Sequence, residues 1–341
     1  MTVAQTSPQR LLVTGAAGQI GSELVPALRG RYGRDNVVAG VYRGQPPSVL
    51  LEGPVERIDV MDLQGIALAV EKHRIDTVVH LAAILSAAGE EDPMQTWRVN
   101  TDGMLNVLEV AREARLRRVL FPSSIAVFGE GAPKDRTPQQ TVLRPVTMYG
   151  VTKVVCEQLG NYYVHRFGLD VRGLRLPGII SSEAPPGGGT TDYAVAIFYE
   201  AVRGRPYTAF LKPDTMLPMM YMPDCIRAMI ELLEADFSRL SHHCDFNVAG
   251  FSTSPRMLAA AIRRHYPEFE VRYEPDFRQD IADSWPNSLD DSVAREEWGW
   301  QHAYDLKATV KVMIERLSRR FELESPTDLG SDVPWQPKEE T

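Results

Sequence analysis

Tyr149 and Lys153 are the residues of this chain whose types and spacing most directly indicate catalysis. They are four residues apart, so on a helix both side chains project from the same face. A tyrosine hydroxyl ordinarily keeps its proton up to a pKa of about 10, and a nearby ammonium favours the phenolate. A group poised in this way can move a proton on or off an alcohol. Such a pair also arises by chance, so its weight here comes from Ser124 upstream and from a glycine-rich loop near the start of the chain.

That loop predicts a dinucleotide site. Gly15, Gly18 and Gly21 follow a strand predicted over Arg10–Thr14 and open a helix predicted to run to about Arg31. Glycines let the backbone turn tightly and approach a pyrophosphate, whose charge the helix N-terminus stabilises. The alternative to a dinucleotide site is a glycine-rich turn that binds no ligand. We predict that the loop binds NAD through five residues: Gly15, Gly18, Gln19, Ile20 and Gly21.

Further cofactor contacts are predicted from later segments. Asp59 ends the third predicted strand and is a candidate to hold the adenine amino group, with the alternative that it is a surface carboxylate. The residues expected beside the ribose and nicotinamide are Leu81, Ala82 and Ala83. The remaining predicted contacts are Val60, Asn100, Pro177 and Ile179, together with Tyr149 and Lys153 themselves.

Strands alternating with helices predict the elements that must position these residues. Apolar runs predict strands over Asn36–Val41, Val55–Asp59, Ile75–Leu81, Arg118–Pro122 and Asp170–Leu176. Helical spacing is found over Leu63–His73, Pro93–Arg115 and Thr147–Phe167. This alternation implies an α/β fold with right-handed crossovers. We expect a Rossmann doubly wound parallel sheet with a smaller C-terminal α/β substrate-binding domain.

The composition changes after Leu176. Ser181–Thr191 is a loop rich in proline and glycine, and shorter mixed elements follow it. We expect residues 1–176 to form the NAD-binding domain. Residues 177–321 should form mainly the substrate-binding domain, with some segments returning to the first, and 322–341 a loosely ordered tail.

Bulk properties narrow the classes of function. The 341 residues are 44% hydrophobic and 24% charged, as in an ordinary globular protein. A net charge of −8 argues against nucleic acid or an anionic membrane as the main partner, and no apolar run approaches the roughly 20 residues of a membrane span. The three cysteines have neither metal-like nor disulfide-like spacing, so we predict no metal site and a cytoplasmic location.

Several segments together resemble a known family. The glycine loop, His80–Ala83, Pro122–Gly129 and the Tyr149–Lys153 pair resemble the extended short-chain dehydrogenase/reductases, which include nucleotide-sugar epimerases. Within that family, five segments are similar to the short-chain L-threonine 3-dehydrogenases: Leu85–Glu90, Thr147–Lys153, Gly187–Ala194, Asp214–Met222 and Phe277–Pro286. The similarity covers about Leu11 to Leu317. It implies oxidation of the β-hydroxyl of L-threonine to 2-amino-3-oxobutanoate with NAD.

The resemblance also implies roles for individual residues. Tyr149 would be the base, Lys153 its electrostatic helper, and Ser124 the hydroxyl that hydrogen-bonds the reacting oxygen. Ser123 would be a substrate contact. The register is uncertain by one residue, so which of the two serines contacts the reacting oxygen stays open. The other residues implied to bind L-threonine are Ser86, Gly188, Thr190 and Thr191. The alternative to substrate binding is a structural role, in which Ser86, Thr190 and Thr191 cap local turns.

One position departs from the family. Members usually carry an aspartate where this chain has Val41, and Arg43 follows two residues later. An acid at the end of the second strand accepts the ribose 2′-hydroxyl of NAD, whereas a basic residue suits the 2′-phosphate of NADP. The strength of the NAD preference therefore stays open.

Two other functions remain as alternatives. One is a nucleotide-sugar epimerase or dehydratase of the same superfamily, and the other is a non-catalytic sensor that binds a nicotinamide cofactor. For assembly, we expect a homodimer formed through the helices predicted over Pro93–Arg115 and Thr147–Phe167.

Overall fold

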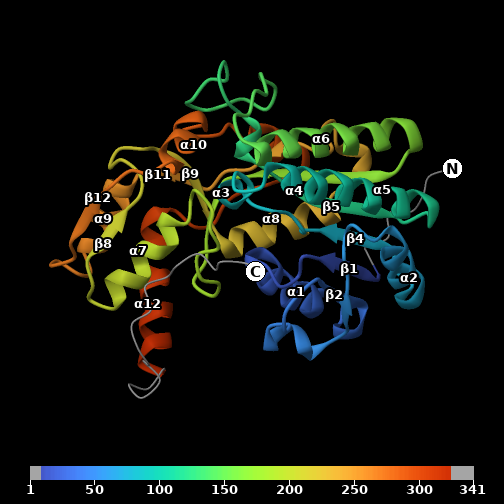
Figure 1. Cartoon of the computed structure of the whole chain (residues 1–341), viewed down its shortest axis with the longest axis horizontal. Helices are drawn as coiled ribbons and strands as arrows, with labels where there is room; N and C mark the ends of the chain where they lie inside the picture. Colours follow the sequence, from blue (N-terminus) through green and yellow to red (C-terminus); the bar gives the residue numbers. More distant parts are fainter. Residues whose placement is uncertain (1–8, 324–341) are drawn as a thin grey trace.

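The computed structural model describes residues 9–323, and its centre is a parallel sheet of seven strands (Figure 1). The strands are β1 (Leu11–Thr14), β2 (Val37–Val41), β3 (Val55–Arg57), β4 (Thr77–His80), β5 (Arg118–Ser124), β6 (Asp170–Leu176) and β10 (Phe246–Asn247). Their order across the sheet is β10-β6-β5-β4-β1-β2-β3. The sheet runs outward in both directions from β1 and β4, which is the doubly wound arrangement. The predicted fold class is confirmed.

Helices cover both faces of this sheet (Figure 1). On one face, α1 (Gln19–Tyr32) and α8 (Met222–Glu234) pack against each other and share a hydrophobic cluster with the strands. On the other face lie α2 (Leu63–His73), α5 (Gly103–Glu113) and α6 (Met148–Phe167). Strands β1, β2 and β4 are buried along their whole length, as expected of strands covered on both sides.

The long helix predicted over residues 93–115 is interrupted. The chain forms α4 (Pro93–Trp97), a π-helical turn, η3 (Arg98–Asp102), and then α5. At this turn the Asn100 side chain forms two hydrogen bonds with the backbone of Ile84, and the Cys156 thiol donates to the Asn100 carbonyl at 3.4 Å. A π turn inserts a residue into a helix and is frequent at functional sites. The loop after β4 is thereby held against the helix.

Most elements after residue 176, apart from α8, build a second layer around a separate hydrophobic cluster. Its strands are β7 (Gly178–Ile180), β8 (Tyr207–Ala209), β9 (Leu217–Tyr221), β11 (Phe251–Thr253) and β12 (Val271–Tyr273). Its helices are α7 (Tyr193–Val202), α9 (Pro255–Arg263), α10 (Arg278–Ser284) and α12 (Leu306–Leu323). Strand β10 and α11 (Ser292–Trp298) instead pack at the edge of the large sheet. The boundary at residue 176 stays a prediction, and residues 324–341 of the predicted tail lie outside the described part.

Short elements complete the chain: η1 (Arg34–Asn36), η2 (Ser48–Glu52), α3 (Ser86–Gly89), η4 (Ile125–Val127) and η5 (Phe237–Arg239). Across residues 9–323, no helix is both long enough and apolar enough to cross a membrane. Within the same range, there is no group of three or more His, Cys, Asp and Glu side chains that could bind a metal ion.

His80 on β4 is a satisfied core histidine. Its Nδ1 lies 2.8 Å from the Thr14 hydroxyl on β1, and the side chain is buried. Burial, helped by the charge of Lys153, lowers the pKa of His80 to about 3. The imidazole therefore stays neutral in the folded protein at ordinary pH.

This buried histidine should make the fold sensitive to acid. Between pH 6.5, the ordinary pKa of histidine, and its folded pKa of about 3, the unfolded chain binds a proton that the folded chain does not. The free energy of unfolding should therefore fall as the pH drops below about 6.5, by about 2 kcal/mol at pH 5. We expect His80→Asn, which can keep the bond to Thr14, to remove this part of the pH dependence. Urea unfolding at pH 8 and pH 5 measures it, with the exposed His265→Asn as control. An unchanged dependence in His80→Asn would contradict the assignment.

Candidate active site

A cleft of about 650 Å³ opens at the carboxyl ends of the large sheet's strands. Its walls include residues that directly follow β1, β2 and β4, together with the ends of β5 and β6. The loop after β7 and the Trp285 side chain close it from the second layer. Ligands of doubly wound sheets bind at this edge.

The cleft brings together most of the predicted site residues. Those that line it are Gly15, Gly18, Gln19, Ile20, Gly21, Asp59, Val60, Leu81, Ala82, Ala83, Ser86, Ser123, Ser124, Tyr149, Lys153, Pro177, Ile179, Thr190 and Thr191. Two predicted residues do not line it, Asn100 and Gly188. Asn100 lies behind the wall, where it holds the backbone of Ile84, a lining residue. Gly188 lies in the loop beside the wall and has a φ of +91°.

The glycine loop fits a dinucleotide. Gly15 has a φ of +67°, and a Cβ there would lie 2.6 Å from the Ala82 nitrogen, so only glycine lets the ends of β1 and β4 approach so closely. Gly18 is the N-cap residue of α1, and it makes no side-chain bond to the N–H groups of the first turn. Backbone N–H groups at a helix N-terminus stabilise a pyrophosphate. The residues of this loop therefore fit the pyrophosphate of a dinucleotide cofactor.

Helix α6 positions the tyrosine and the lysine. It begins after Thr147, whose hydroxyl accepts a hydrogen bond from the Gly150 N–H at 3.1 Å. A Cβ at Gly150 would lie 2.2 Å from the Ala126 carbonyl oxygen, so this glycine lets the first turn of α6 pack directly on η4. Tyr149 is thereby placed next to the segment that follows Ser124.

Lys153 is fixed by the backbone of β5. Its Nζ donates a hydrogen bond to the Pro122 carbonyl at 2.8 Å and lies 5.4 Å from the centre of the Tyr149 ring. The lysine side chain is buried. A positive charge held at this place stabilises a negative charge that forms on the tyrosine oxygen.

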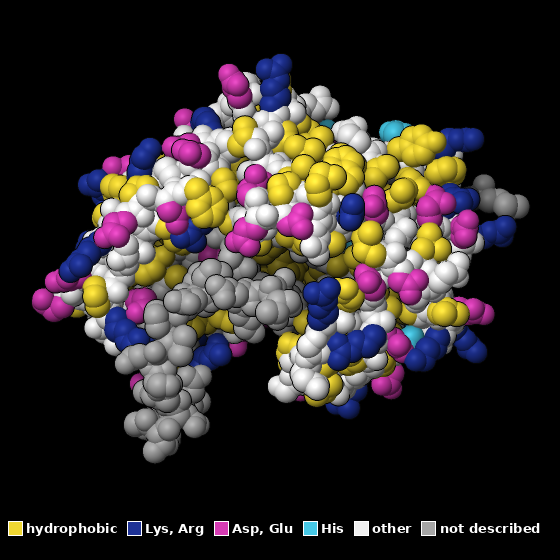
Figure 2. Space-filling model, in the orientation of Figure 1, with side chains coloured by type: hydrophobic (Ala, Val, Ile, Leu, Met, Phe, Trp, Pro, Cys, Tyr) yellow, Lys and Arg dark blue, Asp and Glu magenta, His cyan; other side chains and the backbone are white. Residues whose placement is uncertain are grey.

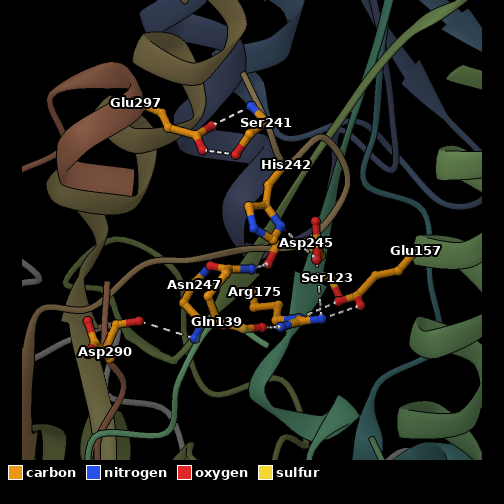
Figure 3. Close-up of polar contacts among 10 residues, drawn as sticks. All are labelled: Ser123, Gln139, Glu157, Arg175, Ser241, His242, Asp245, Asn247, Asp290 and Glu297. Carbon is orange, nitrogen blue, oxygen red and sulfur yellow. Dashed lines mark hydrogen bonds and ion pairs between the residues drawn. The ribbon is translucent and has the colours of Figure 1, made fainter. Parts of the chain in front are cut away.

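Ser123 and Ser124 have different partners. The Ser123 hydroxyl donates to Glu157 of α6 at 2.6 Å (Figure 3). The Ser124 oxygen accepts from the Ala126 N–H at 3.2 Å, so its own hydrogen remains available to donate elsewhere. Successive residues of a strand point to opposite faces. Of the two serines, Ser124 is the one whose hydroxyl is not committed to a buried carboxylate.

Glu157 is itself part of a buried ion pair. Two nitrogens of Arg175, on β6, each donate to a separate Glu157 oxygen at 2.8 Å. Burial raises the pKa of the Glu157 carboxyl, and the bonds from Arg175 and Ser123 oppose that rise. Arg175 also donates to the Gln139 carbonyl, which extends the network toward β10 (Figure 3).

In another part of the cleft wall, two hydroxyls face each other. The Ser86 oxygen of α3 lies 3.2 Å from the Thr190 oxygen, and both side chains are buried. The alternative that these residues cap helices is not supported, because α3 and α7 begin without a side-chain bond from Ser86 or Thr190. Ser86, Thr190 and Thr191 all line the cleft, and we call this part of its wall the polar pocket.

Asp192 organises the glycine-rich loop and was not predicted. Its carboxylate accepts hydrogen bonds from the backbone N–H groups of Gly187 and Gly189 at 2.6 and 2.8 Å. Burial raises the pKa of this carboxyl, while the backbone bonds oppose the rise. The sequence feature that could have indicated this role is the position of the aspartate, directly before the apolar run of α7. Other lining residues that the sequence did not single out are Ala17, Ile58, Met61, Ile84, Leu85, Gln95 and Val99.

Residues 11–249 match the NAD dependent epimerase/dehydratase family. This chain belongs to that family. Membership confirms the superfamily expected from the sequence motifs and supports a nicotinamide cofactor in the cleft.

Relatives within the family agree over nearly the whole chain. An uncharacterized epimerase/dehydratase of Staphylococcus saprophyticus is 46% identical over 318 residues, which cover 93% of this chain and 99% of that protein. The mitochondrial L-threonine 3-dehydrogenase of Bos taurus is 46% identical over 312 residues, which cover 91% of this chain and 83% of that protein. The solved holo form of a GalE-like L-threonine dehydrogenase from Cupriavidus necator is 51% identical, with a TM-score of 0.87 over 90% of this chain and 99% of that one.

The different partners of the two serines give a testable contrast in this family member. Ser123→Ala should lower the free energy of unfolding by about 1–3 kcal/mol, because a buried carboxylate loses a donor. Ser124→Ala, the matched control one residue away, should cost less because it breaks only a turn bond at the surface of the cleft. Urea unfolding at neutral pH measures both losses. Equal losses would show that Glu157 does not depend on Ser123.

Proposed function

We propose that this chain oxidises the β-hydroxyl of L-threonine to 2-amino-3-oxobutanoate, with the nicotinamide of NAD as hydride acceptor. The observation that carries the proposal is that Ser124, Tyr149 and Lys153 line the same cleft as the Ser86–Thr190 hydroxyl pair. Relatives and solved structures of L-threonine dehydrogenases that are about half identical to this chain support it.

In this proposal the tyrosine is the base. The Tyr149 oxygen takes the proton of the substrate's β-hydroxyl, and the Lys153 ammonium, fixed on the Pro122 carbonyl, stabilises the phenolate beforehand. Ser124 donates its hydroxyl hydrogen to the substrate oxygen while that oxygen becomes a carbonyl. These groups are held in place before substrate binds, so little reorganisation is needed during the reaction.

The polar pocket would bind the amino-acid end. The hydroxyls of Ser86, Thr190 and Thr191 can donate to the threonine carboxylate. The backbone of the glycine-rich loop, held by Asp192, forms the adjacent wall. Asn100 would act indirectly by keeping Ile84, and with it the loop that carries Ser86, against the π-helical turn.

The cleft's charges favour a small substrate over a nucleotide sugar. Among the described residues that line it, the basic ones are Arg43, at the adenosine end, and Lys153, which is committed to Tyr149. An epimerase would need further basic residues near the second layer to bind a nucleotide diphosphate. Ser86, Thr190 and Thr191 stand there instead. The sensor alternative gives no reason for a lysine fixed beside a tyrosine.

We also propose that the chain forms a homodimer. Apolar side chains are exposed on α4, α5 and α6, among them Trp97, Leu105 and Tyr162. Hydrophobic side chains gather at the upper right of the molecule, where α4, α5 and α6 lie (Figure 2). Packing a second copy on this face would remove that apolar area from water.

A cytoplasmic location stays a prediction from the spacing of the cysteines.

The substrate can be tested by initial rates of reduced-cofactor formation. We expect L-threonine to be oxidised, and kcat/KM for L-serine to be lower by about tenfold or more, because one missing methyl in a pocket is worth about 1–3 kcal/mol. 3-Hydroxybutyrate lacks the ammonium and should react more slowly still. Redox-neutral turnover of UDP-glucose without threonine oxidation would instead establish the epimerase function.

The base can be tested by Tyr149→Phe. Removing the hydroxyl should reduce kcat with threonine by about 10²–10⁴, the usual contribution of a general base. The protein should still bind cofactor, which separates lost chemistry from lost folding. The exposed Tyr162→Phe, on the same helix, is the matched control and should keep wild-type kcat. Near-wild-type turnover of Tyr149→Phe would exclude this tyrosine as the base.

A further inference from the structure

The adenosine end of the cleft differs in chemistry from the catalytic end. It is formed by the carboxyl end of β2 and the segment after β3, at the edge of the large sheet. Val41 is the last residue of β2, and its buried side chain faces the cleft wall. In dinucleotide sites an acid at this end of the second strand accepts the ribose 2′-hydroxyl, and it would repel a phosphate there. An apolar residue does neither.

Arg43 supplies a positive charge two residues beyond Val41. It lines the cleft and is exposed. Its guanidinium lies 4.7 Å from the centre of the Tyr42 ring, and its Nη2 donates to the Tyr42 hydroxyl at 3.1 Å. Stacking on an aromatic ring limits the orientations of the guanidinium, which lowers the entropy lost when it binds an anion.

A second arginine adds to the field. Arg57, the last residue of β3, pairs in register with Val41 and donates to the Tyr42 carbonyl at 3.4 Å. The carboxylate that lines this end of the cleft is Asp59, and it accepts a hydrogen bond from the Met61 N–H at 2.9 Å. Glu56 is paired with Lys72 and His73 on α2. The mouth beside Val41 is therefore basic.

We propose that Arg43 binds the 2′-phosphate of NADP, with Arg57 reinforcing the positive field, so that this chain binds NADP more tightly than NAD. Val41 permits this by leaving the phosphate without a carboxylate beside it. Arginine can form two parallel hydrogen bonds to a phosphate, which makes it well suited to this task. The inference rests on the proposed dinucleotide site and adds NADP to NAD as a cofactor that this site accepts.

Calorimetric titration with fragments of the cofactor tests the inference. AMP and adenosine 2′,5′-bisphosphate differ by the 2′-phosphate alone. The wild-type protein should bind the bisphosphate about tenfold more tightly than AMP, the gain of one charge-assisted contact. Arg43→Ala should abolish this difference while changing the affinity for AMP and for NAD by less than about twofold. Arg264→Ala, an exposed arginine at the end of α9, is the control for overall charge and should keep the difference.

Each other outcome overturns the inference. Equal binding of the two fragments by the wild-type protein would show that no 2′-phosphate site exists. Equal weakening of both by Arg43→Ala would show that the arginine stacks on adenine and does not select the phosphate. A difference that survives Arg43→Ala would assign the selectivity elsewhere. Because the fragments carry no nicotinamide and no threonine is present, these results are independent of whether the chain oxidises threonine.

Discussion

The buried ion pair between Glu157 and Arg175 is the interaction on which the catalytic end of the molecule depends. It joins α6 to β6, while the Ser123 hydroxyl ties the same carboxylate to β5 (Figure 3). Both side chains are almost completely buried. Removing one partner of such a pair costs about 3–5 kcal/mol because the other charge stays buried and unpaired. Helix α6 therefore has one stable register against the sheet.

That register sets the geometry of the cleft. Glu157 is one helical turn beyond Lys153, and Lys153 is one turn beyond Tyr149, so fixing one fixes the direction of all three side chains. Lys153 then reaches the Pro122 carbonyl, and Gly150 admits the close contact between α6 and η4. The same strand, β5, carries Ser124 at its end. Strand and helix are thus locked together on both sides of the proposed reaction centre.

Local patterns in the chain predicted the framework well. Apolar runs placed six strands of the large sheet, and the glycine spacing and the Tyr149–Lys153 pair located the cleft. Features that depend on distant partners could not be read in this way. The π-helical turn arises from bonds between Asn100 and Ile84 and from Cys156, 56 residues further along the chain. The role of Ser123 depends on Glu157, and nothing near the serine in the chain indicates that its hydroxyl donates to this buried carboxylate. Asp192 was missed because its partners are backbone groups of a loop with no periodic pattern.

The two ends of the cleft differ in how strongly the fold constrains them. At the proposed catalytic end, Lys153, Glu157 and Arg175 are buried, and their bonds join α6 to β5 and β6, so a substitution there disturbs several elements at once. At the end of the cleft beside Val41, Arg43 belongs to an exposed segment, and its guanidinium lies over the ring of its neighbour Tyr42. A change at this end alters the charge that meets the ribose without moving α6 or β5. This independence gives a physical reason why a substitution at Val41 leaves the proposed catalytic residues, Ser124, Tyr149 and Lys153, undisturbed.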